Sequence, residues 1–219
     1  MTISGDAINA YIATTPAMDE GLDAARADAS ELDLSVPDAA TGEALKLLAS
    51  LATGWSRAGN EVAQCIAVTP ASGVVGLHLF AGMPENGHLS CIDPDTEHQR
   101  LAKEAFRVAG YGPSRYRFLP ARALDVMERL APNSYSLIYV EAAPSDLVAI
   151  RDLALPLLNP GGVLVFPDTL LDGTIGDDTR TDRMTVAARE ADATLLETAD
   201  VTVARLPIGA GATVLHKRG

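Results

Sequence analysis

Cysteine and aromatic residues are scarce in this chain of 219 residues. The two cysteines, Cys65 and Cys91, lie in short apolar runs and are too few for a disulfide framework, so we expect buried, reduced thiols. Phenylalanine, tryptophan and tyrosine make up 5% of the residues, whereas the hydrophobic fraction reaches 47%. That balance argues against a disordered chain and predicts a globular core of small aliphatic side chains.

Basic residues and long hydrophobic runs are also lacking. The 17 Lys and Arg residues face 29 Asp and Glu residues, and the resulting net charge of −12 argues against binding to a nucleic-acid backbone. No apolar stretch reaches the roughly 18 residues of a membrane span, and no basic segment leads into an apolar run at the start of the chain. We therefore expect a cytoplasmic protein that binds neither nucleic acid nor membrane.

The acidic residues gather at the start of the chain. The pattern predicts that residues 1–35 form an N-terminal helical extension with a solvated acidic face, broken near Thr15 and Pro16; a docking surface for a basic partner is the alternative. Apolar residues such as Ile8 and Tyr11 are interspersed, so the extension should cover its own sheet or a neighbouring molecule. The acids of residues 1–40 are Asp6, Asp19, Glu20, Asp23, Asp28, Glu31, Asp33 and Asp38.

Further along, short apolar runs alternate with helical patterns. Strands are predicted at 65–68, 89–92, 116–119, 137–140 and 163–166. The alternation favours a parallel sheet covered by helices on both faces, with the first strand between the second and the fourth. Two more strands, 201–206 and 212–215, are joined by a short connection, which predicts a hairpin and an antiparallel last strand.

Three of the predicted strands end in an acid, namely Asp93, Glu141 and Asp168. Open α/β sheets bind ligands at the carboxyl ends of their strands, and a carboxylate after the second strand suits the two hydroxyls of a ribose. A helix cap or turn is the alternative role for Asp93. The loop after the first strand is poor in glycine and matches neither the dinucleotide fingerprint nor a P-loop. The four histidines show no metal-ligand spacing and are expected on helices or the surface.

Four stretches, 92–95, 155–168, 171–173 and 206–209, resemble the small cation-dependent O-methyltransferases of the catechol and caffeoyl-coenzyme A type. The similarity spans residues 36–217 and is strongest to O-methyltransferase-like proteins of mycobacteria and corynebacteria. It implies a Rossmann-like class I methyltransferase domain at residues 36–219, with a seven-stranded, mostly parallel sheet whose last strand is antiparallel. It also implies methyl transfer from S-adenosylmethionine to a hydroxyl of a small-molecule acceptor, and a homodimer.

The resemblance also assigns roles to individual residues. Asp93 would hold the ribose of the methyl donor, and Glu141 and Asp168 would be catalytic. A magnesium ion would be held by Glu141, Asp168 and Thr169. The residues implied in donor binding are Val36, Thr69, Pro70, Ala71, Ser72, Gly73, Val75, Asp93, Ala121, Arg122 and Glu141.

The chain departs from the family pattern at several of these places. The family's first loop reads Glu-x-Gly-x-x-x-Gly, where this chain has Ala67, Thr69 and Gly73. Pro144 stands at the position of the catalytic lysine, and Thr169 replaces an asparagine. A non-catalytic relative that binds a ligand or partner is therefore the alternative function. A nicotinamide dehydrogenase is a third possibility, which the missing glycine fingerprint disfavours.

Overall fold

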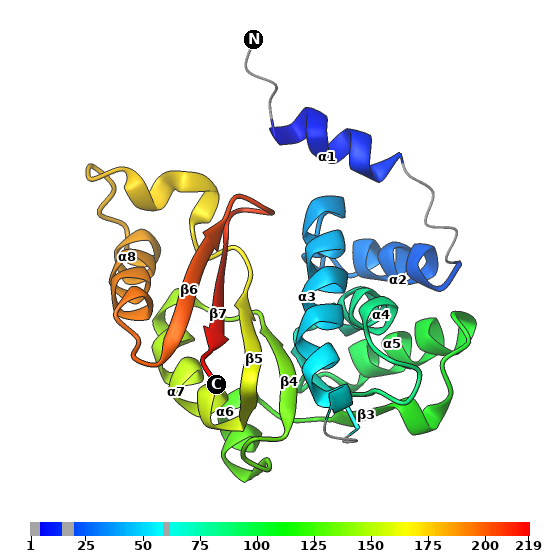
Figure 1. Ribbon diagram of the computed structural model, residues 1–219. Helices are drawn as coiled ribbons and strands as arrows, with labels where there is room; N and C mark the ends of the chain where they lie inside the picture. The colour runs from blue at the N-terminus through cyan, green and yellow to red at the C-terminus, as the bar shows by residue number, and fades with distance from the viewer. Residues whose placement is uncertain (1–4, 15–19, 59–61) are drawn as a thin grey trace.

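The computed structural model describes residues 5–14, 20–58 and 62–219. Seven strands form one sheet in the order β3-β2-β1-β4-β5-β7-β6 (Figure 1). Strand β7 pairs antiparallel with both β5 and β6, while β1 to β5 pair in parallel. The strands are β1 Gln64–Val68, β2 His88–Ile92, β3 Tyr116–Leu119, β4 Tyr135–Val140, β5 Leu158–Phe166, β6 Val201–Leu206 and β7 Ala212–Lys217.

This topology confirms the fold predicted from the sequence, including the place of β1 between β2 and β4. The strands read as continuous apolar runs because both faces of the sheet are buried. Along β1, Cys65 and Ala67 face one hydrophobic cluster, while Ile66 and Val68 face the other. The turn predicted at 159–162 lies inside β5, where Gly161 takes a positive φ near a register shift against β4.

Helices cover the two faces as separate groups (Figure 1). Helices α2 to α5 pack on the face of the sheet that contains Cys65 and Ala67. Helices α6 to α8, with a short 3-10 turn, pack on the face that contains Ile66 and Val68. None of the described helices is both long and apolar enough to cross a membrane. The helices are α1 Gly5–Ala13, α2 Glu20–Glu31, α3 Ala39–Ala58, α4 Ser72–Gly82, α5 Thr96–Val108, α6 Ala123–Val126, α7 Leu147–Leu157 and α8 Arg183–Leu196.

The N-terminal extension packs against the chain's own sheet domain. Helix α2 buries Gly21, Ala25 and Ala29, and a Cβ added at Gly21 would lie 2.7 Å from the Ala105 oxygen of α5. These small residues allow the helix backbones to approach closely. The break predicted near Thr15 and Pro16 lies outside the described residues.

Candidate active site

Three parallel strands bring their final residues to one edge of the sheet. Val68 is in register with Ile92 of β2 and with Val140 of β4, so the residues that follow, Thr69, Asp93 and Glu141, are neighbours. The Glu141 amide donates a hydrogen bond to the Val68 oxygen at 2.9 Å, which holds this alignment past the strand end. The predicted convergence of Asp93 and Glu141 at this edge therefore follows from the parallel register.

Thr69 ties the first loop to Glu141. Its hydroxyl donates to Glu141 Oε2 at 2.7 Å and accepts from the Ala71 amide at 3.1 Å. Thr69 is buried, as are Ala71, Ser72 and Gly73 behind it. Thr69 stands where the family pattern has a glycine, and a glycine here would leave the loop without this anchor. The chain therefore has a side-chain hydrogen bond at a position where the family has a more flexible backbone.

Asp93 is buried and held by residues of the following helix. The His98 Nδ1 lies 2.6 Å from Asp93 Oδ2, and because a carboxylate only accepts, the ring nitrogen donates. The Gln99 side chain donates to the Asp93 backbone oxygen at 2.6 Å. Asp95, rather than Asp93, caps α5 by accepting from the Glu97 amide at 2.8 Å. The capping role considered for Asp93 thus falls to Asp95, while Asp93 Oδ1 accepts from the Asp95 amide at 3.4 Å, as the alternative of a turn predicted.

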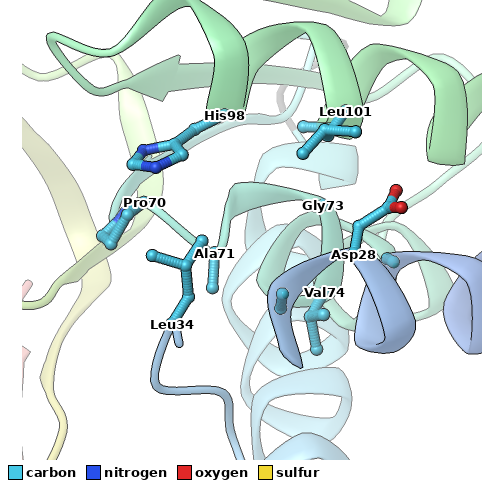
Figure 2. A pocket seen from close by; sticks show the side chains of 11 residues that line it. Asp28, Leu34, Pro70, Ala71, Gly73, Val74, His98 and Leu101 are labelled. Atoms are coloured by element: carbon cyan, nitrogen blue, oxygen red, sulfur yellow. The ribbon is translucent and has the colours of Figure 1, made fainter. Parts of the chain in front are cut away.

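His98 also borders a small cavity beside the first loop (Figure 2). The cavity has about 20 Å³, room for roughly one water, and Pro70, Ala71 and Gly73 face α2 across it. Val75 is fully buried in the core, so it supports the loop from behind and does not line the cavity. His98 was expected to be an ordinary helix or surface residue. The available signal was its position in the first turn of α5, five residues after Asp93.

A larger cavity of about 250 Å³ opens beside Glu141. It brings together Val36, Glu141 and Asp168, three of the predicted site residues, which come from separate parts of the chain. It also includes Asp38 and Thr41, which sequence reasoning missed. The residues that line it are Ser35, Val36, Pro37, Asp38, Thr41, Tyr139, Glu141, Pro167, Asp168, Gly209 and Ala210.

Asp38 faces this cavity and is not part of the solvated acidic face predicted for the extension. Its carboxylate accepts from the Thr41 hydroxyl and from the Thr41 amide, the latter at 2.7 Å, and also from the Asn9 side chain and the Gly209 amide. Burial raises the pKa of Asp38, but these hydrogen bonds outweigh burial and hold the pKa below its ordinary value. Asp38 therefore carries its charge at neutral pH.

Glu141 experiences the opposite balance. Burial raises the pKa of Glu141, the Thr69 hydrogen bond lowers it, and the nearby Asp168 and Asp93 raise it further, so the net shift is upward. Burial, with Glu141 and Asp168 close by, also raises the pKa of the Tyr139 hydroxyl. The carboxylates of Asp93, Glu141 and Asp168 thus repel one another at this edge of the sheet, and the hydrogen bond from Thr69 to Glu141 offsets the repulsion only in part.

We expect Glu141→Gln to stabilise the fold near neutral pH. A carboxyl whose pKa is raised on folding contributes stability that is lost as the pH rises above its unfolded value, about 4.5. Glutamine carries no charge and can still accept from Thr69. The free energy of unfolding, measured by denaturant titration, should therefore exceed that of wild type near neutral pH and converge with it below 4.5. Glu43→Gln on the exposed face of α3 should show no such gain; equal behaviour of both variants would contradict the prediction.

Asp168 and Thr169 point in different directions. Asp168 Oδ1 accepts from the Ala210 amide at 2.8 Å, which places the carboxylate under the β6–β7 turn beside the cavity. The Thr169 hydroxyl is buried away from the cavity, 2.7 Å from the Thr213 hydroxyl and 3.3 Å from the Gly211 oxygen. No group of three or more His, Cys, Asp or Glu residues within the described ranges could hold a metal ion. The residues therefore do not fit the magnesium site predicted at Glu141, Asp168 and Thr169.

The remaining predicted positions lie around this edge. Ala121 follows β3 and its amide donates to the Leu119 oxygen, which turns the chain directly after the strand. Arg122 is exposed at the start of α6. Pro144 begins a short 3-10 turn, Pro144–Asp146, that leads into α7. Pro144 can supply neither a base nor an amide proton at the lysine position.

Comparison with known proteins agrees with this architecture. The family described as O-methyltransferase matches residues 30–218. This chain belongs to the O-methyltransferase family. Family membership confirms the resemblance drawn from the sequence, and the matched residues include the whole sheet and every predicted site position.

Individual relatives share nearly the full length of the chain. A Mycolicibacterium vanbaalenii protein classed by name among the O-methyltransferases is 40% identical over 188 residues, which is 86% of this chain and 80% of the relative. A Corynebacterium glutamicum protein of known structure is 48% identical, covering 98% of this chain and 97% of its own, with a TM-score of 0.92.

A more distant structure shares the fold. The O-methyltransferase of Streptomyces achromogenes involved in tomaymycin synthesis, solved with S-adenosylmethionine, is 23% identical over 100% of both chains, with a TM-score of 0.81.

Proposed function

We propose that this protein transfers the methyl group of S-adenosylmethionine to a hydroxyl group of a small molecule. The observation that carries the proposal is the edge formed by Thr69, Asp93 and Glu141 in a member of the O-methyltransferase family. Glu141 of this edge also lines the cavity of about 250 Å³. The donor, bound at this edge of the sheet, and the acceptor, bound in the cavity, would meet beside Glu141. This family membership supports an enzyme over the non-catalytic alternative.

Asp93 would hold the donor by accepting hydrogen bonds from its ribose hydroxyls. His98 fixes the Asp93 carboxylate at 2.6 Å, so its orientation is set before the donor arrives. The loop from Thr69 to Gly73, anchored by the Thr69–Glu141 hydrogen bond, would carry the methionine part. Val36, which lines the larger cavity, would pack near the donor. Ala121 and Arg122 would lie near the adenine.

The cavity residues would align and activate the acceptor hydroxyl. Methyl transfer is an in-line displacement: the acceptor oxygen forms a bond to the methyl carbon while the carbon–sulfur bond breaks and its electron pair returns to sulfur. The hydroxyl proton must leave, and the carboxylates of Glu141 and Asp168 border the cavity where they can accept it. Alignment alone can supply several kcal/mol of the barrier. No step runs through a metal ion, because the residues present do not fit one.

A calorimetric titration with S-adenosylmethionine and with its demethylated product tests the donor half of this proposal. Binding of either, with no heat from NAD, is expected. Methyl transfer to phenolic acceptors, followed by mass spectrometry, tests the chemistry. No donor binding at millimolar concentration would overturn the proposal and favour the non-catalytic alternative, whereas heat from NAD alone would favour a dehydrogenase.

We also propose a cytoplasmic homodimer, with residues 1–35 as the extension and residues 36–219 as the methyltransferase domain. Both cysteines are free and buried, as suits a reducing compartment. Ile8 and Tyr11 on α1 are 52% and 76% exposed, and Leu47 and Leu51 on the neighbouring α3 are 59% and 60% exposed. Apolar side chains so exposed suit a surface covered by a second copy. A monomer mass by light scattering across a wide concentration range would overturn the dimer.

A further inference from the structure

We propose that Tyr139 is a catalytic residue: its phenol hydroxyl donates a hydrogen bond to the acceptor oxygen while the Glu141 carboxylate takes the proton of that oxygen. The inference rests on the proposed function and names a group that would touch the reacting atoms. Three observations lead to it, namely the place of Tyr139 in the wall of the larger cavity, the hydrogen bonding of its hydroxyl, and the other polar groups of that wall.

Tyr139 lies in β4, two residues before Glu141, and lines the larger cavity. It is 3% exposed and packs in the hydrophobic cluster on the face of the sheet that α3 covers, so its ring has a fixed place. After burial, the charges of Glu141 and Asp168 are the causes that raise the pKa of the Tyr139 hydroxyl. Both carboxylates line the cavity, so the hydroxyl lies at the cavity end of the ring.

The Tyr139 hydroxyl makes no hydrogen bond with any residue that the structure describes. Tyr135, at the start of the same strand, shows the usual arrangement: it is equally buried, and its hydroxyl accepts from Arg117 Nη2 at 3.1 Å. Buried tyrosine hydroxyls normally find such a partner, because an unmade hydrogen bond is costly. A buried hydroxyl that lacks a partner and borders a cavity is placed to bond a ligand there.

The other polar groups of the cavity wall cannot take this role. None of the described residues that line the cavity is Lys, Arg or His, and its carboxylates accept hydrogen bonds when ionised. The Thr41 hydroxyl already donates to Asp38, and Ser35 is exposed. Pro144 stands where the family has a lysine. Tyr139 is thus the buried hydroxyl of this wall that is available to donate to an acceptor.

The Tyr139 hydroxyl would make the acceptor oxygen easier to deprotonate. Tyr139 keeps its proton at neutral pH, because burial and the nearby carboxylates raise its pKa. A hydrogen bond from it stabilises negative charge on the acceptor oxygen and so lowers the pKa of the acceptor hydroxyl. The proton passes to Glu141, the oxygen forms a bond to the methyl carbon, and the carbon–sulfur bond breaks with its electron pair returning to sulfur.

Tyr139→Phe removes the hydroxyl and keeps the ring. We expect kcat for methyl transfer to a phenol to fall by about ten- to a hundred-fold, with donor affinity within about twofold and a thermal midpoint that is unchanged or higher. Tyr135→Phe is the matched control, because Tyr135 is buried in the same strand and does not line the cavity. It should keep its kcat and lose about 2–4 °C in thermal midpoint, since Arg117 loses a partner. Wild-type kcat in Tyr139→Phe would overturn the proposal.

A spectroscopic titration separates a hydrogen bond to the acceptor oxygen from a structural role. The ionised form of para-nitrophenol absorbs visible light, so its ionisation can be followed when it is bound to the full chain with saturating S-adenosylhomocysteine. The midpoint of this ionisation should lie about one pH unit higher in Tyr139→Phe than in wild type, because the variant cannot donate to the ionised oxygen. Tyr135→Phe should match wild type. Equal midpoints in wild type and Tyr139→Phe, or a nitrophenol spectrum that wild type leaves unchanged, would overturn the assignment.

Failure of the inference and failure of the proposed function give different results. Equal methyl transfer by wild type and Tyr139→Phe would refute the role of Tyr139 and leave the methyltransferase function intact. A wild-type protein that neither binds the donor nor transfers a methyl group would refute the proposed function. The nitrophenol titration without S-adenosylhomocysteine would then still decide whether the Tyr139 hydroxyl bonds a phenol oxygen in the cavity.

Discussion

Asp93→Ala is expected to weaken binding of S-adenosylmethionine by about ten- to a hundred-fold, which corresponds to about 1.5–3 kcal/mol. Asp93 is buried at the carboxyl end of β2, beside Thr69, and the His98 ring holds its carboxylate in place. A hydrogen bond between a ribose hydroxyl and such a carboxylate is charge-assisted, so its loss costs more affinity than the loss of a neutral hydrogen bond. Calorimetric titration of the donor into wild type and variant measures the change.

Asp95→Ala provides the control for this prediction. Asp95 lies two residues further on. Its side chain is 53% exposed, caps α5 through the Glu97 amide, and lies 3.9 Å from His98 Nε2, on the side of the ring away from Asp93. Its removal should cost about 1 kcal/mol of stability and change donor affinity far less than Asp93→Ala does, because Asp95 reaches the ribose site only through His98. His98→Ala should weaken donor binding less than Asp93→Ala, because the ring orients the carboxylate without replacing it. If Asp93→Ala binds the donor as tightly as wild type, the ribose site is misassigned.

Asp168→Ala is expected to lower kcat/KM for methyl transfer by about a hundred-fold while donor affinity stays within about twofold. The Asp168 carboxylate borders the cavity and accepts from the Ala210 amide at 2.8 Å, so it positions the β6–β7 turn over the cavity in which we propose that the acceptor binds. A displacement of about 1 Å at a reacting centre can cost this much in rate. Asp168 also adopts φ +55, a conformation that costs alanine roughly 1–2 kcal/mol. Steady-state kinetics and donor titration on the same preparation separate the two readouts.

Asp200→Ala controls for backbone strain. Asp200 has φ +59 and is exposed at the start of β6, the end of that strand opposite to the turn over the cavity. It should lose comparable stability but keep its kcat/KM. Asp168→Asn should retain more activity than Asp168→Ala, since asparagine tolerates this conformation and its oxygen can accept from Ala210. Undiminished methyl transfer by Asp168→Ala would show that the turn does not order the acceptor.

Much of the fold could be read from local patterns. The continuous apolar runs that became β1, β2 and β4 required burial on both faces, and parallel strands with helical crossovers satisfy that requirement. The connection between Leu206 and Ala212 is too short for a crossover, so β7 had to run antiparallel to β6. The convergence of Asp93 and Glu141 followed as well, because the carboxyl ends of adjacent parallel strands meet at one edge.

The content of the site depended on contacts between residues far apart in the chain. Asp38 was one of many acids near the start of the sequence until the packing of α3 and the β6–β7 turn placed it against Gly209. Thr169 matched a family ligand by position, but its hydroxyl bonds Thr213, 44 residues away, and so turns from the cavity. The sequence pattern predicted the strands and the residues that end them, and the short connection predicted that β6 and β7 pair as a hairpin. Only the tertiary structure decided where those side chains point, because a polar group's orientation is set by whichever partner the packing brings within hydrogen-bond distance.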